Sequence, residues 1–259
     1  GIAGVGIATL IDRILMMVVM CWYVLKSKYF KDYMVHFRMF AVQAQKIKAI
    51  LKIGTPVAFQ YTFEVGLFAG ASLIAGKIGA LDQAAHNVAI TLASMTYMMA
   101  TGIASAMTIK IGNSYGKENF ERLKTFAKIS YNIILGFMIF TAILFAVFNH
   151  TLASLMTTDP EVIALAAQLL IIAGLFQLFD GTQVIGLGIL RGIGDVNIPT
   201  IITLFAYWVI GLPAGYYMGI ELEMGVQGVW YGLTFALLVS SILLYLRYKY
   251  MINRKFAIS

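Results

Sequence analysis

Six long stretches of this chain contain at most one charged residue, and their lengths constrain the fold more than any other feature. They hold between 23 and 30 residues each, and they lie between Lys52 and Lys77, Asp82 and Lys110, Lys128 and Asp159, Glu161 and Arg191, Asp195 and Glu221, and Glu223 and Arg247. A helix of about 20 residues crosses the hydrocarbon layer of a membrane. A seventh stretch, from about Gly4 to Leu25, is interrupted only by Asp12 and Arg13. We therefore expect seven transmembrane helices, because an isolated strand in lipid leaves its backbone unpaired.

The composition of the chain excludes several other classes of protein. Hydrophobic residues occupy 60% of the 259 positions and charged residues 12%, whereas about 25% of a soluble domain is charged. These values exclude a soluble globular enzyme and a disordered chain. The single cysteine, Cys21, excludes an internal disulfide. The expected fold class is an all-α, polytopic membrane helix bundle.

Basic residues are concentrated in alternate connections between the expected helices. The connections 26–52 and 110–128 contain seven and five Lys or Arg residues, and the tail from Arg247 contains four. With Arg191 included, 17 of the 19 basic residues fall on one side of the membrane. Positive charge is retained on the cytoplasmic side of membrane proteins. We therefore expect the C-terminus to lie in the cytoplasm.

This orientation divides the chain into four parts. Residues 1–25 are expected to form a helix that runs from outside to inside, 26–53 a basic cytoplasmic connection, 54–248 a six-helix lobe and 249–259 a basic cytoplasmic tail. Within the connection, Gln43–Lys52 has apolar and basic residues on opposite faces, which predicts an interfacial helix. Because the uncharged start of the chain lies outside, we also expect further helices upstream of it.

Two features of the six-helix lobe predict how its helices pack. Pro213 lies inside the stretch 196–220 and is expected to kink that helix, because proline removes a backbone hydrogen bond. Small residues spaced four apart permit helices to approach closely. They are Gly66 and Gly70, then Gly211, Gly215 and Gly219, and then Gly228 and Gly232.

Glu64 is the twelfth of the 24 residues between Lys52 and Lys77, so it falls near the middle of the membrane. A charge at a helix centre costs about 2.5–3.5 kcal/mol on insertion scales and rarely faces lipid. Glu64 should therefore face a partner, face a water-filled cavity or be protonated. Gln60, one turn earlier on the same face, can complete a polar site. A coupled transporter needs such a carboxyl to bind and release a cation, and a structural carboxyl bonded to a neighbouring helix is the alternative.

Asp180 is the second acid expected near the middle of the membrane. It lies eleven residues before Arg191, which corresponds to about 16 Å of helix. Gln177 and Gln183 lie three residues before and after it and share its face, which we expect to line the interior. Two such acids on separate helices favour cation handling over a purely structural polar network.

The sequence contains no complete motif for nucleotide binding, metal binding or hydrolytic catalysis. The stretch Gly70–Lys77 resembles a phosphate-binding loop, but five residues separate its glycines instead of four and Ile78 replaces Ser or Thr. The three histidines, His36, His86 and His150, show no metal-ligand spacing. The chain also has no HExxH or GxSxG element. We expect neither an enzyme nor a protein that binds nucleotides or nucleic acid.

Several short motifs are typical of one known family, and the likeness covers the chain from Gly4 to about Tyr248. They are Gly54-Thr55-Pro56, Phe63-Glu64-Val65, Ala84-Ala85-His86, Tyr97-Met98 with Gly102, Phe176-Gln177 with Asp180, Leu190-Arg191-Gly192, Tyr207-Trp208 with Pro213, and Gly228-Val229-Trp230. In combination they resemble helices seven, eight, ten, eleven and twelve of multidrug and toxic compound extrusion (MATE) transporters. The likeness is greatest to the NorM-like branch.

The resemblance implies a twelve-helix transporter of the cell inner membrane with two pseudo-symmetric lobes. This chain would be helix six plus the C-terminal lobe, with a missing N-terminal lobe as its partner. Family members export cationic, amphipathic drugs or toxic compounds by alternating access, in exchange for H⁺ or Na⁺ and without a cofactor. By motif, Glu64 and Asp180 would bind the coupling cation, as metal ligands only if that ion is Na⁺. Some members have a tyrosine where this chain has Phe176, which favours a proton.

Several aromatic residues of the expected spans are candidates for the path of the drug, because ring faces attract organic cations. Ordinary contact with lipid or another helix is the alternative for each. The candidates are Tyr61, Phe68, Phe176, Tyr207 and Trp208.

Two other functions stay open. A related lipid-linked saccharide flippase would carry basic residues along its central cavity, whereas the expected interior charges of this chain are mainly acidic. A non-transporting membrane subunit or an intramembrane enzyme is the other class. The enzyme would need a paired nucleophile and base or metal ligands within the bilayer, and the sequence shows none.

Overall fold

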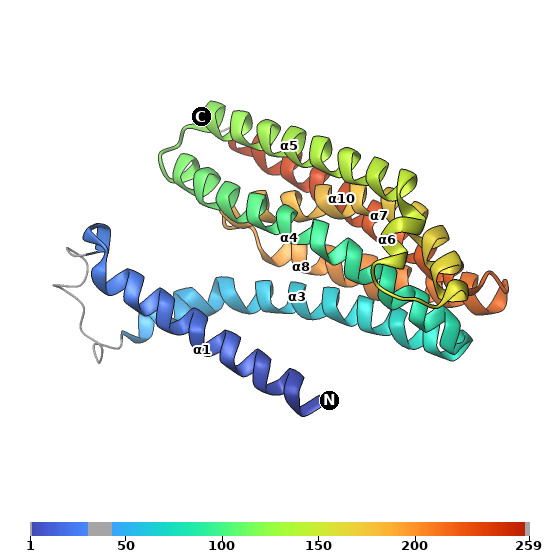
Figure 1. Ribbon diagram of the computed structural model, residues 1–259. Coiled ribbons are helices and arrows are strands. Elements are labelled where there is room, and N and C mark those ends of the chain that lie inside the picture. The colour runs from blue at the N-terminus through green and yellow to red at the C-terminus, as the bar shows by residue number, and fades with distance from the viewer. Residues whose placement is uncertain (1, 31–42, 257–259) are drawn as a thin grey trace. The chain divides into compact units, whose positions relative to one another are not determined.

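The computed structural model describes residues 2–30 and 43–256, and every regular element within these ranges is helical (Figure 1). The elements are α1 (Ile2–Lys26), η1 (Lys28–Phe30), α3 (Ala44–Ile78), α4 (Ala80–Gly116), α5 (Phe120–Val147), α6 (Asn149–Ser154), α7 (Pro160–Gly192), α8 (Asn197–Leu204), η2 (Phe205–Gly211), α9 (Leu212–Tyr216), η3 (Tyr217–Glu221) and α10 (Gly225–Phe256). Within residues 2–30 and 43–256, seven helical segments are long and apolar enough to cross a membrane. The expected all-α class and its seven spans are therefore confirmed.

The chain forms two compact units, residues 1–50 and residues 51–259. The first unit contains α1, η1 and the first turns of α3. Residues 31–42 of the expected basic connection lie outside the described residues. The expected interfacial helix at Gln43–Lys52 is helical from Ala44, and it continues without a break through Pro56 into the membrane span. Its position at the membrane surface stays a prediction.

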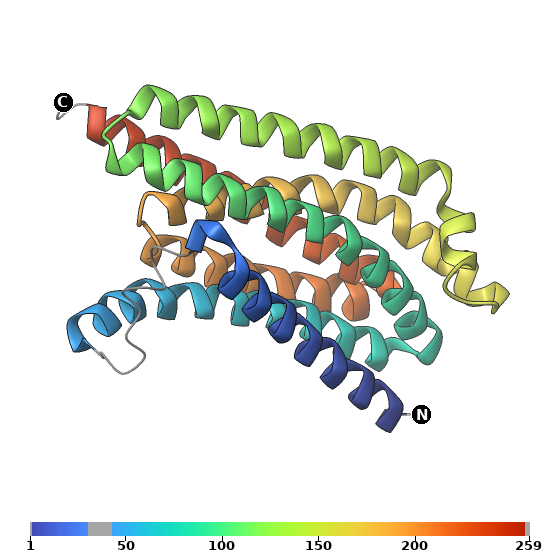
Figure 2. The ribbon, with the colours of Figure 1, turned by 60° about the vertical axis from the view of Figure 1, so that its left-hand side comes forward.

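Helix α7 is the centre of the second unit. It packs against α4, α5 and α10, which lie side by side with it in Figure 2. All eight residues from Gln183 to Leu190 are buried, so every side of this part of α7 faces other helices. A helix that is apolar all round is expected in such a position. The buried side chains around it form two hydrophobic clusters, one containing Phe176 and Trp230 and the other containing Ile185 and Leu244.

The span that contains Pro213 is irregular, as its sequence predicts. Between α8 and α9 the chain adopts the π-helical segment η2, and a second π-helical segment, η3, follows α9. Proline lacks an N–H, and its ring clashes with the carbonyl four residues earlier, so the α-helical hydrogen-bond pattern cannot continue through Pro213. Widened π turns accommodate this mismatch and are frequent at functional sites.

The predicted close approach of helices at small residues is present. Gly66 lies under the indole of Trp208, and Gly70 lies under Leu212. Gly228 lies against the backbone of Met218, and Gly232 against the backbone of Gly215. Side chains at these positions would push the sixth span away from α3 and from α10. The glycines therefore determine how closely the helices of the second unit pack.

We expect Gly232→Ala to destabilise the protein by about 1–3 kcal/mol, because the added methyl group meets backbone atoms that cannot move aside. Thermal melting in detergent measures the effect. Gly136→Ala on α5 is the matched control, since no atom lies within 4 Å of a Cβ placed there. Melting temperatures that fall equally in both variants would contradict this account of the packing.

Candidate functional site

The two acids that the sequence singled out, Glu64 on α3 and Asp180 on α7, line the same cavity. The cavity has a volume of about 470 Å³. The other residues that line it are Tyr61, Val65, Phe68, Ile90, Ala93, Ser94, Tyr97, Met98, Thr101 and Phe176. The exposed side chains Tyr61, Val65 and Met98 form part of its rim. Folding thus brings together two carboxyls that lie 116 positions apart in the sequence.

Both carboxyls are buried, and each has an oxygen without a hydrogen-bond donor among the described residues. The residue exposure is 6% for Glu64 and 3% for Asp180. The atoms without a partner are Oε1 of Glu64 and Oδ1 of Asp180. Buried polar atoms are normally hydrogen-bonded, so each of these oxygens needs a partner from outside the described residues. A proton, a hydrated ion or a cationic group would satisfy these oxygens.

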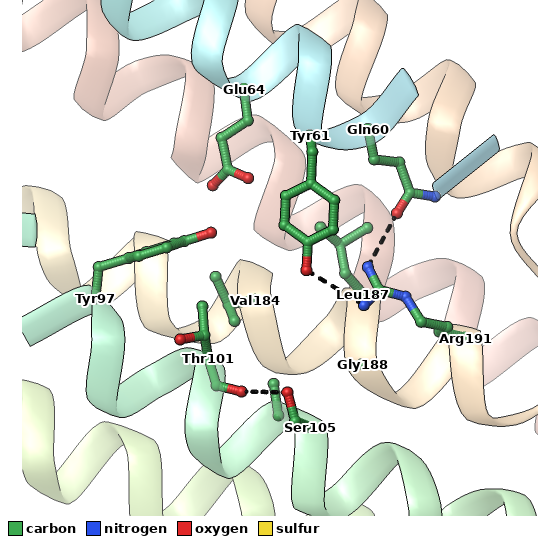
Figure 3. Close-up of a pocket in the computed structure, with 11 residues that line it drawn as sticks. Gln60, Tyr61, Glu64, Tyr97, Thr101, Ser105, Val184, Leu187, Gly188 and Arg191 are labelled. Atoms are coloured by element: carbon green, nitrogen blue, oxygen red, sulfur yellow. Dashed lines mark hydrogen bonds between the residues drawn. The ribbon is translucent and has the colours of Figure 1, made fainter. Parts of the chain in front are cut away.

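A row of hydroxyl groups on α4 faces the acids. Ser94, Tyr97 and Thr101 line the cavity, and Ser105 continues the row by donating to the carbonyl oxygen of Thr101 at 2.7 Å. In Figure 3 the hydroxyl of Tyr97 points toward the carboxyl of Glu64. The sequence analysis did not assign these residues to the site. The signal was available, because positions 94, 97, 101 and 105 fall on one face of a helix.

A second, much smaller cavity of about 30 Å³ adjoins the first (Figure 3). Both cavities are lined by Tyr61, Glu64, Tyr97 and Thr101, so Glu64 lies where they meet. The small cavity extends along the row of hydroxyls past Ser105, in the direction of the basic end of α7.

Arg191 lies at the far end of the small cavity. The sequence analysis counted it among the basic residues and in a family motif but did not assign it to the site. Its Nη1 donates to the hydroxyl of Tyr61 at 3.4 Å and its Nη2 to Oε1 of Gln60 at 3.5 Å. Its guanidinium also lies 5.5 Å from the centre of the Tyr61 ring, within the range of a cation–π interaction. A single arginine therefore places positive charge on the same cavity as Glu64.

Of the three predicted supporting amides, only Gln60 lines a cavity with Glu64. Its Nε2 donates to the carbonyl oxygen of Val196 at 3.1 Å and to Oγ1 of Thr200 at 3.0 Å. These bonds connect α3 to the start of α8 and hold the Gln60 oxygen toward Arg191.

The other two amides, Gln177 and Gln183, are buried as expected but line neither cavity. Gln177 accepts a hydrogen bond from Oγ1 of Thr96 at 2.9 Å, which joins α7 to α4. Neither side-chain polar atom of Gln183 has a hydrogen-bond partner within the described ranges. Since α7 is buried on every side here, burial alone did not identify which of its polar residues face the cavity.

Three of the five aromatic candidates line the large cavity, namely Tyr61, Phe68 and Phe176. The rings of Phe68 and Phe176 meet edge to face with centroids 6.1 Å apart. Tyr207 is fully buried in the hydrophobic core instead. Trp208 turns toward α3, where its Nε1 donates to the carbonyl oxygen of Phe63 at 3.3 Å.

The family model MatE matches residues 56–217, which is more than half of the chain. The chain belongs to the MatE family. This confirms the resemblance found in the sequence motifs. The matched region includes Glu64, Asp180 and all the residues that line the two cavities.

Curated relatives within the MatE family include a "Probable multidrug resistance protein NorM" from Agrobacterium fabrum, which is 33% identical over 261 residues and covers 98% of this chain and 56% of the relative. A "Multidrug resistance protein MdtK" from Photorhabdus laumondii is 33% identical over 251 residues, with 95% and 55% covered. This chain therefore spans about half the length of the curated relatives it matches.

Solved structures of MATE transporters share the fold. The outward-facing conformation of a multidrug resistance MATE family transporter gives a TM-score of 0.86 at 20% identity, over 99% of this chain and 57% of that one. The eukaryotic MATE transporter AtDTX14 gives 0.84 at 19% identity, over 93% and 55%. Together with the seven spans, the family makes this a multi-pass membrane protein.

The large cavity should contain water when the protein is in a membrane. We therefore expect Ser94→Cys, which lines the cavity, to react with a water-soluble thiol reagent, because a thiol needs water to ionise. The neighbouring Met95 is 63% exposed but does not line the cavity, so Met95→Cys should react at least tenfold more slowly. Both variants are made with Cys21→Ser and compared in vesicles. Equal rates would contradict a water-filled cavity on this face of α4.

Proposed function

We propose that this chain is one lobe of a cation-coupled exporter of cationic, amphipathic compounds. The observation that carries the proposal is the pair of buried carboxyls, Glu64 and Asp180, on the wall of one cavity. The named multidrug resistance relatives support export of small molecules, and their length supports a second lobe that completes the cleft. No basic residue lines the larger cavity within the described part of the chain, which disfavours a saccharide flippase.

The chemistry of exchange follows from the cost of burying charge. When no cation is bound, Glu64 and Asp180 leave negative charge in a cavity of low polarity, which attracts an organic cation. The rings of Phe68 and Phe176 then contact the apolar part of that compound. When H⁺ or Na⁺ neutralises the acids, this attraction is lost and the compound leaves. Rocking of the two lobes would expose the same site to each side of the membrane in turn.

The position of Arg191 indicates the side on which the coupling ion leaves Glu64. It lies at the end of the small cavity nearer the basic connections, which we assign to the cytoplasm. There its positive charge stabilises an ionised Glu64 after the coupling ion has left. The row of hydroxyls at Tyr97, Thr101 and Ser105 supplies polar groups along the route between them.

Phe176 supports a proton as the coupling ion. It lines the cavity one turn before Asp180, and its ring has no oxygen to offer a sodium ion. Sodium in proteins is held by several oxygen ligands, as other hard cations are. A proton needs only one carboxyl oxygen, and both acids have an oxygen that no donor within the described ranges occupies.

We expect Glu64→Gln and Asp180→Asn each to reduce drug export by at least tenfold at normal protein levels, because an amide cannot take up and release a cation. Export of a fluorescent cationic dye from drug-sensitive cells measures the effect. Glu121→Gln is the matched control, since the Glu121 side chain is 81% exposed at the start of α5. Export at the wild-type rate by Glu64→Gln would exclude the coupling role.

The coupling ion is tested in proteoliposomes of the intact transporter with separate pH and Na⁺ gradients. We expect the pH gradient alone to drive export by the wild type. Phe176→Tyr adds a phenolic oxygen beside Asp180 and should increase the response to a Na⁺ gradient. Transport by the wild type that responds only to Na⁺ would contradict the assignment of a proton.

A further inference from the structure

A third cavity lies on the opposite side of α7 from the acids. It is a groove of about 1,040 Å³ between α5 and α10, with Leu178, Phe179 and Thr182 of α7 along its floor. None of the residues that line it lines either of the other two cavities. The proposed transport mechanism therefore does not use it.

The groove is basic at one end and apolar at the other. Helix α5 begins where α10 ends, so Lys124 and Lys128 from the start of α5 lie at the same end as Lys249 and Asn253 from the last turns of α10. Toward the other end, the lining residues are Leu135, Leu178, Leu238 and Ile242.

Two of the three lysines at the basic end, Lys128 and Lys249, have no carboxylate partner within the described residues. Glu121 is the carboxylate that pairs there, at 3.4 Å from Lys124. Lys124, Lys128, Lys249 and Glu121 together carry a formal charge of +2. No ion pair within the described part of the chain involves Lys128 or Lys249, and the ammonium of Lys249 lies 4.8 Å from the centre of the Tyr245 ring.

We propose that this groove binds an anionic phospholipid of the cytoplasmic leaflet. The lysines would hold its phosphate, and its acyl chain would lie along the leucines. Basic pockets between membrane helices are known to bind anionic headgroups in this way. Tyr245 and Tyr248 line the groove near Lys249, at the level where tyrosines meet lipid headgroups.

The dimensions of the groove agree with this occupant. From Lys124 to Leu135 the helix rises about 16 Å, and one leaflet of the hydrocarbon core is about 15 Å thick. A cationic drug would be repelled by the lysines at the basic end. A second protein helix would fill the apolar part but would leave the lysines without counter-charge. An anionic phospholipid supplies both the counter-charge for the lysines and an acyl chain for the apolar part of the groove.

The experiment is native mass spectrometry of the intact protein in mild detergent, titrated with phosphatidylglycerol or phosphatidylcholine. We expect one phosphatidylglycerol to bind preferentially. Lys128→Ala with Lys249→Ala should weaken its binding by about 30-fold, because each lysine near a membrane surface attracts anionic lipid. Lys110→Ala with Lys117→Ala is the matched control, since these exposed lysines lie on the same expected side but outside the groove.

Two further measurements distinguish binding of a whole phospholipid from binding of its headgroup alone. Leu135→Trp fills the apolar part of the groove and keeps all lysines, so it should also weaken binding of phosphatidylglycerol. Glycerol 3-phosphate should not compete, because it has no acyl chain. Equal binding of the two lipids, equal losses in both lysine variants, or full competition by glycerol 3-phosphate would each overturn the proposal. None of these results depends on transport, so failure here leaves the proposed function intact.

Discussion

The cost of placing a carboxylate in hydrocarbon determines how the second unit of this protein is arranged. An acid at the middle of a membrane helix must face water, a counter-charge or a proton. Glu64 and Asp180 meet this requirement together, on one cavity whose wall also carries the hydroxyls of α4. Arg191 adds a counter-charge at the end of the adjoining cavity. The two buried acids and the arginine near them are thereby gathered on two adjoining cavities.

Helix α7 contributes to all three cavities, with one face along the two polar cavities and the opposite face at the groove between α5 and α10. Phe176 and Asp180 line the large cavity, and Gly188 and Arg191 line the small one. Thr182 lies on the floor of the groove between α5 and α10. Glycines allow neighbours to approach this helix closely, as at Gly188, where a Cβ would lie 3.1 Å from the carbonyl oxygen of Ala104. A change in the rotation of α7 about its axis would alter all three cavities at once.

Sequence reasoning identified the two acids correctly as buried residues, because the expense of a charge at a helix centre depends on local sequence alone. It did not assign Arg191 or the hydroxyl row that includes Tyr97 to the site, although both residues occur in the family motifs. It also gave Tyr207 and Trp208 the same standing as Phe68, although they lie outside the cavity. Aromatic residues are common in membrane helices, and their type does not reveal which neighbour each ring meets.

The seven spans, the helical class and the concentration of basic residues in alternate connections follow from the sequence by itself. Each depends on the hydrophobicity and charge of a continuous stretch of chain, which no distant residue changes. Only the tertiary structure decided that Glu64 and Asp180 share a cavity, that Gln177 and Gln183 do not line it, and that lysines of α5 and α10 meet at one groove. These facts depend on how each helix is rotated about its axis, and the rotation is set by side-chain packing between residues far apart in the chain.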